Sequence, residues 1–298
     1  MTRATLHVPK SATEVDRLLA GGADGALLLA GGTDLLVQRR AGRAVATMID
    51  LTNVTDGPPP VAQQGAHTLR LSAITPISVI DDHLGTALPG IRAAIAAFAS
   101  PQIRHRATIG GNLGTASPSG DLMPPLIVCD AVVQLRGSTG RRKVPLDRFL
   151  LGPRQTGLAP GEWIEAVDVS DAPPDPGADV LHGFRKIGAR AALTISVVNL
   201  AWSASLMPNG TLRAVRLAVG AAAPTVVRCR RAEAALEGRT PAAGLGEAVA
   251  AIAADLQPID DVRGSAGYRR RAAGGLLAEM LTAALVRNSN DYLRKDHP

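Results

Sequence analysis

Two glycine-rich turns, each placed where a strand is expected to end, constrain this chain more than any other feature. The first is Ala30-Gly31-Gly32-Thr33-Asp34-Leu35, and the second is Thr108-Ile109-Gly110-Gly111-Asn112-Leu113. Paired glycines permit positive φ and a close approach of backbone to an anion, and successive N–H groups can then point into one concavity. Neither turn is a Walker loop or a nicotinamide-binding G-x-G-x-x-G turn. Most such glycine pairs, taken alone, are simple tight turns, so either turn by itself is weak evidence; together they predict a pyrophosphate held from two sides.

Later segments strengthen this interpretation. They are Val144-Pro145-Leu146-Asp147-Arg148-Phe149, Pro160-Gly161-Glu162, Phe184-Arg185-Lys186-Ile187-Gly188-Ala189-Arg190, Ala223-Pro224-Thr225 and Ala266-Gly267-Tyr268-Arg269. In this order, with the two turns, they resemble the FAD-binding (medium) subunit of molybdenum hydroxylases, the family of xanthine dehydrogenase, aldehyde oxidoreductase and carbon monoxide dehydrogenase. The resemblance extends over nearly the whole chain.

The resemblance implies an α+β fold in two domains. Residues 1–175 would form an FAD-binding domain of the vanillyl-alcohol oxidase (PCMH) type, with subdomains of about 1–57 and 58–175. Residues 178–298 would form a C-terminal α+β domain with a three-stranded antiparallel sheet and a helical layer on one face. The proline-rich segment 171–177 has the composition of a linker, and the boundary is predicted there.

Local patterns predict the elements of these domains. Ser11-Ala12-Thr13-Glu14 is a capping box that starts a helix. This helix is expected between strands near 5–9 and 26–29, and a third strand is expected near 46–51. Thr33 or Asp34 can cap a short helix after the first turn. Helices are expected at 77–84, 89–99, 226–237, 243–255 and about 265–287, with strands at 68–72, 131–135, 143–145, 163–167, 181–187, 195–206 and 212–219.

The cofactor site is predicted from the two turns and from residues that match family positions. In the first turn the backbone from Leu29 to Leu36 and the Thr33 hydroxyl would bind the pyrophosphate. The full predicted set is Leu29, Ala30, Gly31, Gly32, Thr33, Asp34, Leu35, Leu36, Phe98, Thr108, Ile109, Gly110, Gly111, Asn112, Ser117, Asp121, Ile164 and Lys186.

Four of these residues have competing interpretations. The resemblance implies that Asp121 accepts hydrogen bonds from ribose or ribityl hydroxyls of the cofactor. The alternative is that Asp121 is a helix N-cap. The resemblance places Lys186 near the flavin, where a cation stabilises the reduced form; a solvated strand end is the alternative. Phe98 and Ile164 match FAD-contact positions, but both also read as core residues, Phe98 because it continues a helical apolar face. For Arg104-His105-Arg106, before the second turn, a solvated charge cluster is favoured over steering of the diphosphate or contact with a partner subunit.

Composition narrows the function further. The two cysteines, Cys129 and Cys229, cannot supply the four thiolates of an iron–sulfur cluster, and no His or Cys spacing predicts a metal site. The net charge of +6 comes with only 2% aromatic residues, so single-strand nucleic-acid binding is not predicted. No apolar run reaches about 18 residues and no signal-peptide pattern is present, so no membrane span and a cytoplasmic location are expected.

The predicted function is therefore that of an FAD-binding electron-transfer subunit with no catalytic residue of its own. The resemblance implies a large molybdopterin subunit and a small [2Fe–2S] subunit as partners, in a heterotrimer or its dimer, with NAD⁺ or another acceptor. Carbon monoxide dehydrogenases tend to carry Gly-Asp-Tyr where this chain has Ala191-Ala192-Leu193-Thr194, which favours the xanthine, aldehyde or N-heterocycle branch. A stand-alone FAD-dependent oxidoreductase with its own substrate pocket is the alternative, and a nucleotide-binding scaffold is a third.

Overall fold

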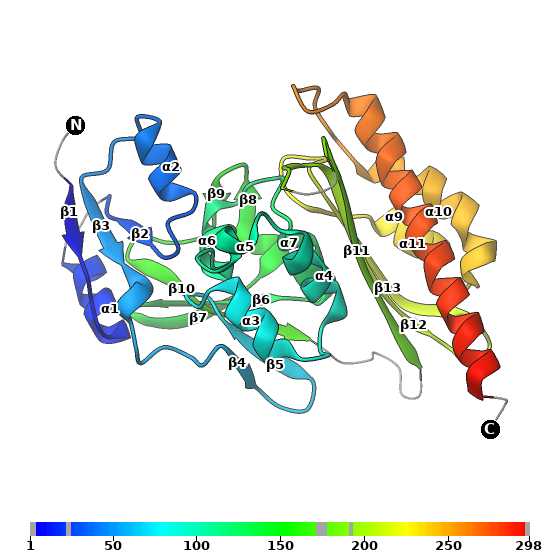
Figure 1. The fold of residues 1–298 in the computed structure, drawn as a ribbon, viewed down its shortest axis with the longest axis horizontal. Helices are drawn as coiled ribbons and strands as arrows, with labels where there is room; N and C mark the ends of the chain where they lie inside the picture. The colour runs from blue at the N-terminus through cyan, green and yellow to red at the C-terminus, as the bar shows by residue number, and fades with distance from the viewer. Residues whose placement is uncertain (1–3, 22–24, 171–177, 191–192, 296–298) are drawn as a thin grey trace. The chain divides into compact units, whose positions relative to one another are not determined.

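The computed structural model describes residues 4–21, 25–170, 178–190 and 193–295, with side chains as far as residue 283. The chain divides into two compact units that interleave along the sequence (Figure 1). Unit 1 comprises Met1–Ala87, Phe98–Ser117 and Asp130–Asp171. Unit 2 comprises Leu88–Ala97, Pro118–Cys129 and Ala172–Pro298. The predicted linker 171–177 lies outside the described residues, and the division at 175–178 stays a prediction.

Unit 1 holds most of the first half of the chain. Its elements are β1 (Thr5–His7), α1 (Ala12–Ala20), β2 (Leu27–Leu29), α2 (Leu35–Arg40), β3 (Thr47–Asp50), the 3₁₀ turn η1 (Leu51–Asn53), β4 (Val61–Gln63), β5 (Thr68–Ser72), α3 (Ile77–Leu84), α5 (Pro101–Arg104), α6 (Ile109–Thr115), β6 (Val132–Gly137), β7 (Gly140–Pro145), α8 (Leu146–Phe149), β8 (Leu150–Gly152), β9 (Gln155–Thr156) and β10 (Glu162–Ser170).

A small parallel sheet opens unit 1, in the order β1-β3-β2. Ser11 begins α1 as predicted, because its Oγ accepts the Glu14 N–H at 3.2 Å. The Glu14 carboxylate accepts from the N–H of Lys10 and not from that of Ser11, so the reciprocal bond of the capping box is made to the residue before the N-cap. The core beneath this sheet contains Val15, Ile49 and Trp163. The predicted β-α-β start is thus confirmed as a parallel arrangement.

The second sheet of unit 1 is antiparallel, in the order β4-β5-β10-β6-β7. β10 forms its centre, pairing with β5 on one side and β6 on the other. The predicted hairpin around 137–140 is confirmed as β6 and β7, with Gly140 at a φ of 129°. Strands β4, β8 and β9 were not predicted, because two or three residues are too few to display an alternating pattern.

Unit 2 contains one sheet and five helices within its described residues. Its elements are α4 (Pro89–Ala97), α7 (Met123–Val128), β11 (Asp179–Gly188), β12 (Ser196–Leu206), β13 (Leu212–Gly220), β14 (Val227–Arg228), α9 (Arg230–Leu236), α10 (Pro241–Asp255) and α11 (Ala266–Lys295). The strands lie in the order β11-β12-β13-β14, and every pair is antiparallel.

Two details of the predicted C-terminal sheet are wrong. It has a fourth strand, β14, of two residues, where a helix was expected to begin. Helices also cover both faces, not one: α9 and α11 contact one face of the sheet, while α4 and α7 contact β11, β12 and β13 on the other (Figure 1). All eleven residues of β12 are buried, as a strand covered on both faces requires.

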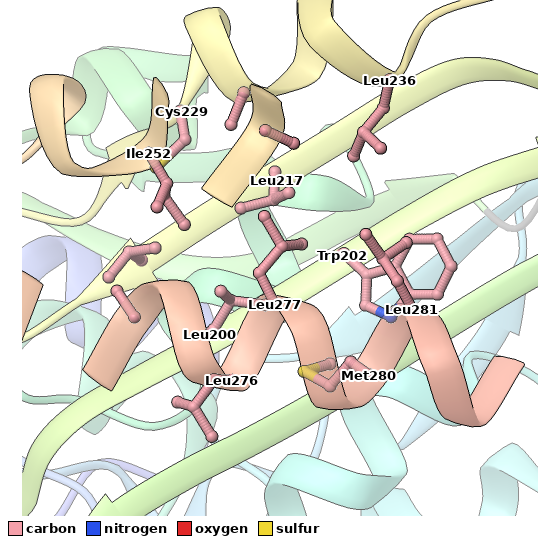
Figure 2. Packing of buried hydrophobic residues seen from close by; sticks show 14 of the residues in the cluster. Leu200, Trp202, Leu217, Cys229, Leu236, Ile252, Leu276, Leu277, Met280 and Leu281 are labelled. Carbon is pink, nitrogen blue, oxygen red and sulfur yellow. The ribbon is translucent and has the colours of Figure 1, made fainter. Parts of the chain in front are cut away.

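The main core of unit 2 lies between the sheet and its C-terminal helices. Figure 2 shows Leu277 and Leu281 of α11 directed toward Leu200 and Trp202 of β12, with Ile252 of α10 nearby. Cys229 is in the same cluster, and burial raises the pKa of its thiol well above the usual range. This cysteine is therefore an inert packing residue, as is expected of a buried free thiol.

An ion-pair cluster joins the central strand of unit 1 to its neighbours. Glu165 accepts from Arg141 at 2.8 and 2.9 Å and from Arg136 at 3.0 Å. Burial by itself raises the pKa of the Glu165 carboxyl, but the two guanidinium groups outweigh it and hold the pKa below its usual range. Arg136 also binds Asp16, which accepts the Trp163 indole N–H at 2.9 Å.

This cluster predicts an acid-sensitive contribution to stability. Because the folded pKa of Glu165 is lowered, its contribution is present above the unfolded pKa of about 4.3 and is lost as pH falls through the lower folded value. The melting temperature of wild type should thus fall more steeply below pH 4 than that of Glu165→Gln. Melting curves between pH 3 and pH 7 measure this, with the exposed Glu279→Gln as control. Parallel curves for wild type and Glu165→Gln would contradict the assignment.

Candidate functional site

The first glycine turn is shaped by a contact of backbone against backbone. It follows β2, and a Cβ on Gly31 would lie 1.8 Å from the carbonyl oxygen of Arg106. Gly32 has a φ of 72°, in the left-handed region that favours glycine. Gly31 is therefore required for space and Gly32 for conformation, and the contact brings the first turn against the residues that precede the second.

The first turn offers a run of free amide donors. Within the described residues, the backbone N–H groups from Gly31 to Leu35 have no hydrogen-bond acceptor in the protein. Ordered by the turn, consecutive unpaired N–H groups are donors suited to an anion. The turn is only partly buried, so a ligand can reach it.

Asp34 connects the first turn to the end of α6 through side chains. It occupies the N-cap position of α2 but makes no side-chain cap bond, so its predicted capping role is wrong. Its carboxylate instead accepts from the Gln38 amide and, at 3.1 Å, from the Thr115 hydroxyl at the end of α6. Thr115 was missed by the sequence interpretation, because a threonine at a helix end carries no distinguishing pattern.

The second turn uses its amides differently. Thr108 caps α6, its Oγ1 accepting the Gly111 N–H at 2.9 Å, while the Asn112 N–H donates to the Thr108 carbonyl. The Gly110 N–H donates to the Ala73 carbonyl at 2.8 Å, and a Cβ on Gly110 would lie 2.6 Å from that oxygen. The second turn is thus a helix start with satisfied donors and is not a second row of free amides.

What the second turn can offer a ligand is space and side chains. Gly111 is exposed, has no positive φ, and would place a Cβ near one atom alone, Thr108 Oγ1 at 3.1 Å. Its glycine is therefore not required by the chain's own packing. Asn112 contributes a buried Oδ1 with no partner among the described residues. An orphaned buried acceptor beside an open glycine surface suits a bound molecule.

In unit 2 the structure brings two predicted residues together. Lys186 of β11 donates to Asp121 Oδ2 at 2.7 Å, and both side chains are more than nine-tenths buried. Lys186 also donates to the Thr194 carbonyl at 3.2 Å. Asp121 Oδ1 accepts from Ser196 at 2.6 Å and from Asn199 at 3.0 Å. The alternative of a helix cap for Asp121 is wrong, since α7 has Leu122 at its N-cap and no side-chain cap bond.

Ser196 and Asn199 were missed by the sequence interpretation. Both are fully buried in β12. A signal for Asn199 was present, because an amide in the run Val197-Val198-Asn199-Leu200 interrupts an otherwise apolar strand. A buried polar group of this kind needs a partner, and Asp121 provides it.

The remaining predicted residues are dispersed. Phe98 lies one residue beyond the end of α4 and is partly exposed, so it does not continue the buried face of that helix. Ile164 of β10 is 6% exposed and belongs to the core of unit 1. Ser117 is partly exposed and is the last residue of the unit 1 segment Phe98–Ser117. In the charge cluster, Arg104 donates to the carbonyls of Phe98 and Ala99, which gives it a structural role.

Comparison with known proteins identifies the family. Residues 2–170 match the model of the FAD binding domain in molybdopterin dehydrogenase, and residues 184–284 match the CO dehydrogenase flavoprotein C-terminal domain. The chain is 31% identical over 288 residues to the xanthine dehydrogenase FAD-binding subunit of Escherichia coli O157:H7, covering 95% of this chain and 96% of the relative. It is also 31% identical over 295 residues to the carbon monoxide dehydrogenase medium chain of Hydrogenophaga pseudoflava, covering 96% and 98%.

A solved structure agrees with these matches. The chain superimposes on carbon monoxide dehydrogenase from Hydrogenophaga pseudoflava, in a form lacking the Mo-pyranopterin moiety, with a TM-score of 0.88 and 30% identity over 96% of this chain and 98% of that one. The predicted α+β class is confirmed. The chain belongs to the FAD-binding medium subunits of molybdenum hydroxylases, the xanthine dehydrogenase and CO dehydrogenase type. The predicted family is thereby confirmed, and the chain is a flavoprotein subunit of a multi-subunit oxidoreductase.

The residues present fit the FAD that this family binds. The free N–H groups of 31–35 are donors for a pyrophosphate, and Gly111 leaves open a space that a Cβ would enter. Within the described residues, no group of His, Cys, Asp and Glu side chains could hold a metal ion, and no helix is long and apolar enough to cross a membrane. The individual residue contacts to FAD stay predictions.

Gly111→Val tests the open surface on α6. The added branches would occupy ligand space, so FAD affinity should fall about tenfold or more, which is about 1.4 kcal/mol or more. Because the Cβ would also lie 3.1 Å from the capping Thr108 Oγ1, the fold is checked separately. Fluorescence titration with FAD measures the affinity, and far-UV circular dichroism checks the fold. Gly275→Val, at another exposed helical glycine, is the control. Stoichiometric tight FAD binding by Gly111→Val would refute this placement.

Asp121→Ala tests the buried pair. Removing the carboxylate leaves the Lys186 ammonium buried without its counter-charge, so apo stability should fall by about 3–5 kcal/mol. The double variant Asp121→Ala/Lys186→Met should recover much of that stability without recovering FAD affinity. Urea unfolding of the apo proteins and FAD titration give the two readouts. Full FAD affinity in the double variant would show that the pair is only structural.

Proposed function

We propose that this chain passes electrons from the [2Fe–2S] clusters of a small partner subunit through FAD to NAD⁺ or another acceptor. A large molybdopterin subunit would hydroxylate the substrate, and the three chains would assemble as a heterotrimer or its dimer. The observation that carries the proposal is the row of unpaired N–H groups at 31–35, fixed against the start of α6 within one unit. The presence of only two cysteines, both buried, supports placing the clusters on another chain.

In this proposal the protein binds and orients while the bound FAD supplies the redox chemistry. The first turn would donate N–H groups to the pyrophosphate, and the Thr33 hydroxyl would add a further donor. Thr108, Gly110, Gly111 and Asn112 would bound the other side, through the Asn112 side chain and the exposed Gly111 surface rather than through free amides.

Lys186 would set the electrostatics of the flavin site. Two of its three ammonium protons are directed to Asp121 and Thr194, which leaves one donor for a ligand. Asp121 likewise accepts three hydrogen bonds from protein groups and keeps limited capacity for a ribose or ribityl hydroxyl. A fixed cation near the flavin would favour its reduced, anionic form and raise its potential.

The substrate class is proposed from one local difference between this sequence and those of carbon monoxide dehydrogenases. Relatives acting on different substrates lie at nearly the same identity: the 6-hydroxypseudooxynicotine dehydrogenase complex subunit alpha of Paenarthrobacter nicotinovorans is 30% identical over 293 residues, covering 94% of each chain. Identity therefore does not select among them. The sequence at 191–194, of which Ala191 and Ala192 lie outside the described residues, lacks the Gly-Asp-Tyr run and supports a purine, aldehyde or N-heterocycle substrate.

The purified subunit should bind one FAD and no other redox centre. Under anaerobic conditions dithionite should bleach the visible flavin band, and so should NADH if NAD⁺ is the acceptor, because hydride transfer is reversible. Xanthine, aldehydes, carbon monoxide and N-heterocycles should leave the band unchanged until the partner subunits are added. Rapid bleaching by any of these substrates without partners would favour a stand-alone oxidoreductase. Purification without flavin, and no uptake of added FAD, would refute the proposed function.

A further inference from the structure

A buried arginine of α11 organises a network of hydrogen bonds and ion pairs that the cofactor residues do not explain. Arg269 is 2% exposed. Its Nη1 donates to the Ala221 carbonyl at 2.6 Å, and its Nη2 donates to Asp261 Oδ1 at 2.5 Å. Ala221 has a φ of 61°, a left-handed conformation that an L residue adopts at some cost. The arginine therefore holds a strained residue and a loop carboxylate together.

Asp261 extends this network to a second arginine. Its Oδ2 accepts from Arg263 Nη2 at 2.7 Å and from Nε at 3.1 Å, while Oδ1 accepts the Arg263 N–H at 2.8 Å. Burial by itself raises the pKa of Asp261, but the hydrogen bonds from Arg263 and Arg269 outweigh it and lower the pKa to about 2. The carboxylate is thus charged throughout the neutral range.

Both ends of the network lead to the segment that carries Asp121. Arg263 Nη1 donates to Ser119 Oγ at 2.8 Å, and the Ala221 N–H donates to the Pro118 carbonyl at 2.7 Å. Asn199 reaches the Gly120 carbonyl at 3.4 Å and Asp121 Oδ1 at 3.0 Å. Each residue from 118 to 121 is therefore held by a hydrogen bond from another segment of the same unit.

We propose that Arg263 is a positioning residue for the cofactor site: through Ser119 it fixes the backbone of 118–121 and so orients Asp121 and its partner Lys186. The inference rests on the proposed function, because it assigns the network to FAD binding. Asp261, itself bound by Arg269, accepts both the Nε and the Nη2 of Arg263 on its Oδ2, and from this position the Arg263 Nη1 reaches Ser119. Charge-assisted hydrogen bonds of this kind are the stronger ones in proteins, and the planar fork gives them direction.

The surroundings of Arg263 suit a role in orientation more than one in stability. Its side chain is 37% exposed, so truncation leaves no cavity in the core. Arg269, by contrast, is buried, and its removal would leave the Ala221 carbonyl without its side-chain donor and would take one charged donor from Asp261. Arg263 is thus the member of the network whose loss separates orientation from folding.

The experiment is a double-mutant cycle of Arg263→Ala and Ser119→Ala, with FAD affinity measured by titration of apoprotein. Arg239→Ala is the matched control, since Arg239 forms an exposed ion pair with Glu247 in the same unit and makes no hydrogen bond or ion pair with residues 118–121. Each single variant should raise the FAD Kd about tenfold and shift the visible circular dichroism of the bound flavin. The double variant should be no worse than either single one, because both remove the same contact. Apo melting temperatures should stay near that of wild type.

The outcomes separate two failures. If wild type binds FAD and Arg263→Ala binds it equally well, the positioning role is refuted while the proposed function stands. Losses that add in the double variant, or a loss in Arg263→Ala with full affinity in Ser119→Ala, would mean that the arginine acts by its charge alone, and would also refute it. If wild type itself binds no FAD, the proposed function fails and the positioning role fails with it.

Discussion

The close contact between Gly31 and the Arg106 carbonyl is the constraint on which the cofactor site depends. Any side chain at position 31 would collide with backbone at 1.8 Å, so the two glycine-rich segments approach only because this residue lacks a Cβ. The approach orders the first turn, leaves the N–H groups of 31–35 without protein acceptors, and lets Asp34 reach Thr115. Glycine therefore suits the four positions for different reasons. Gly31 and Gly110 lack space for a Cβ, Gly32 has a positive φ, and Gly111 leaves an open surface.

In unit 2 the predicted site residues depend on the buried pair of Lys186 and Asp121. Burying two charges has a large desolvation cost, which is recovered only when the pair and its remaining lone pairs are hydrogen-bonded. Ser196 and Asn199 supply those bonds, and the Arg269–Asp261–Arg263 network holds the segment on which Asp121 lies. This arrangement uses many protein donors on one carboxylate, which points to the orientation of Lys186 as the first role of Asp121.

Much of the fold could be predicted from the sequence, because its elements carry local signals. Ser11 and Glu14 mark the start of α1, and the strand predicted at 68–72 is β5, Thr68–Ser72. What failed was non-local. Helices α4 and α7 belong to the same unit as the C-terminal sheet, although they come earlier in the chain. All six residues of α7, Met123–Val128, are buried, so the sequence has no polar face that would show on which side its packing partner lies. The two-residue strand β14 carries no pattern of its own.

For the candidate site, too, local patterns could be predicted from the sequence and three-dimensional contacts could not. The glycine turns could be found as a pattern, but their physical reasons could not, since φ and close contacts appear only in three dimensions. Asp121 and Lys186 were predicted for separate roles, and their pairing across 65 residues was not foreseen. Only the interrupted apolar run at Asn199 hinted at the network that joins them.

Amide hydrogen exchange of residues 31–35, with and without saturating FAD, tests the central claim most directly. Without FAD these N–H groups have no acceptor within the described chain and should exchange rapidly. With FAD bound they should become protected, more than the amides of α6, whose donors are already satisfied by Thr108 and Ala73. Unchanged rapid exchange at 31–35 in a protein that holds one FAD would contradict the assignment of this turn to the cofactor.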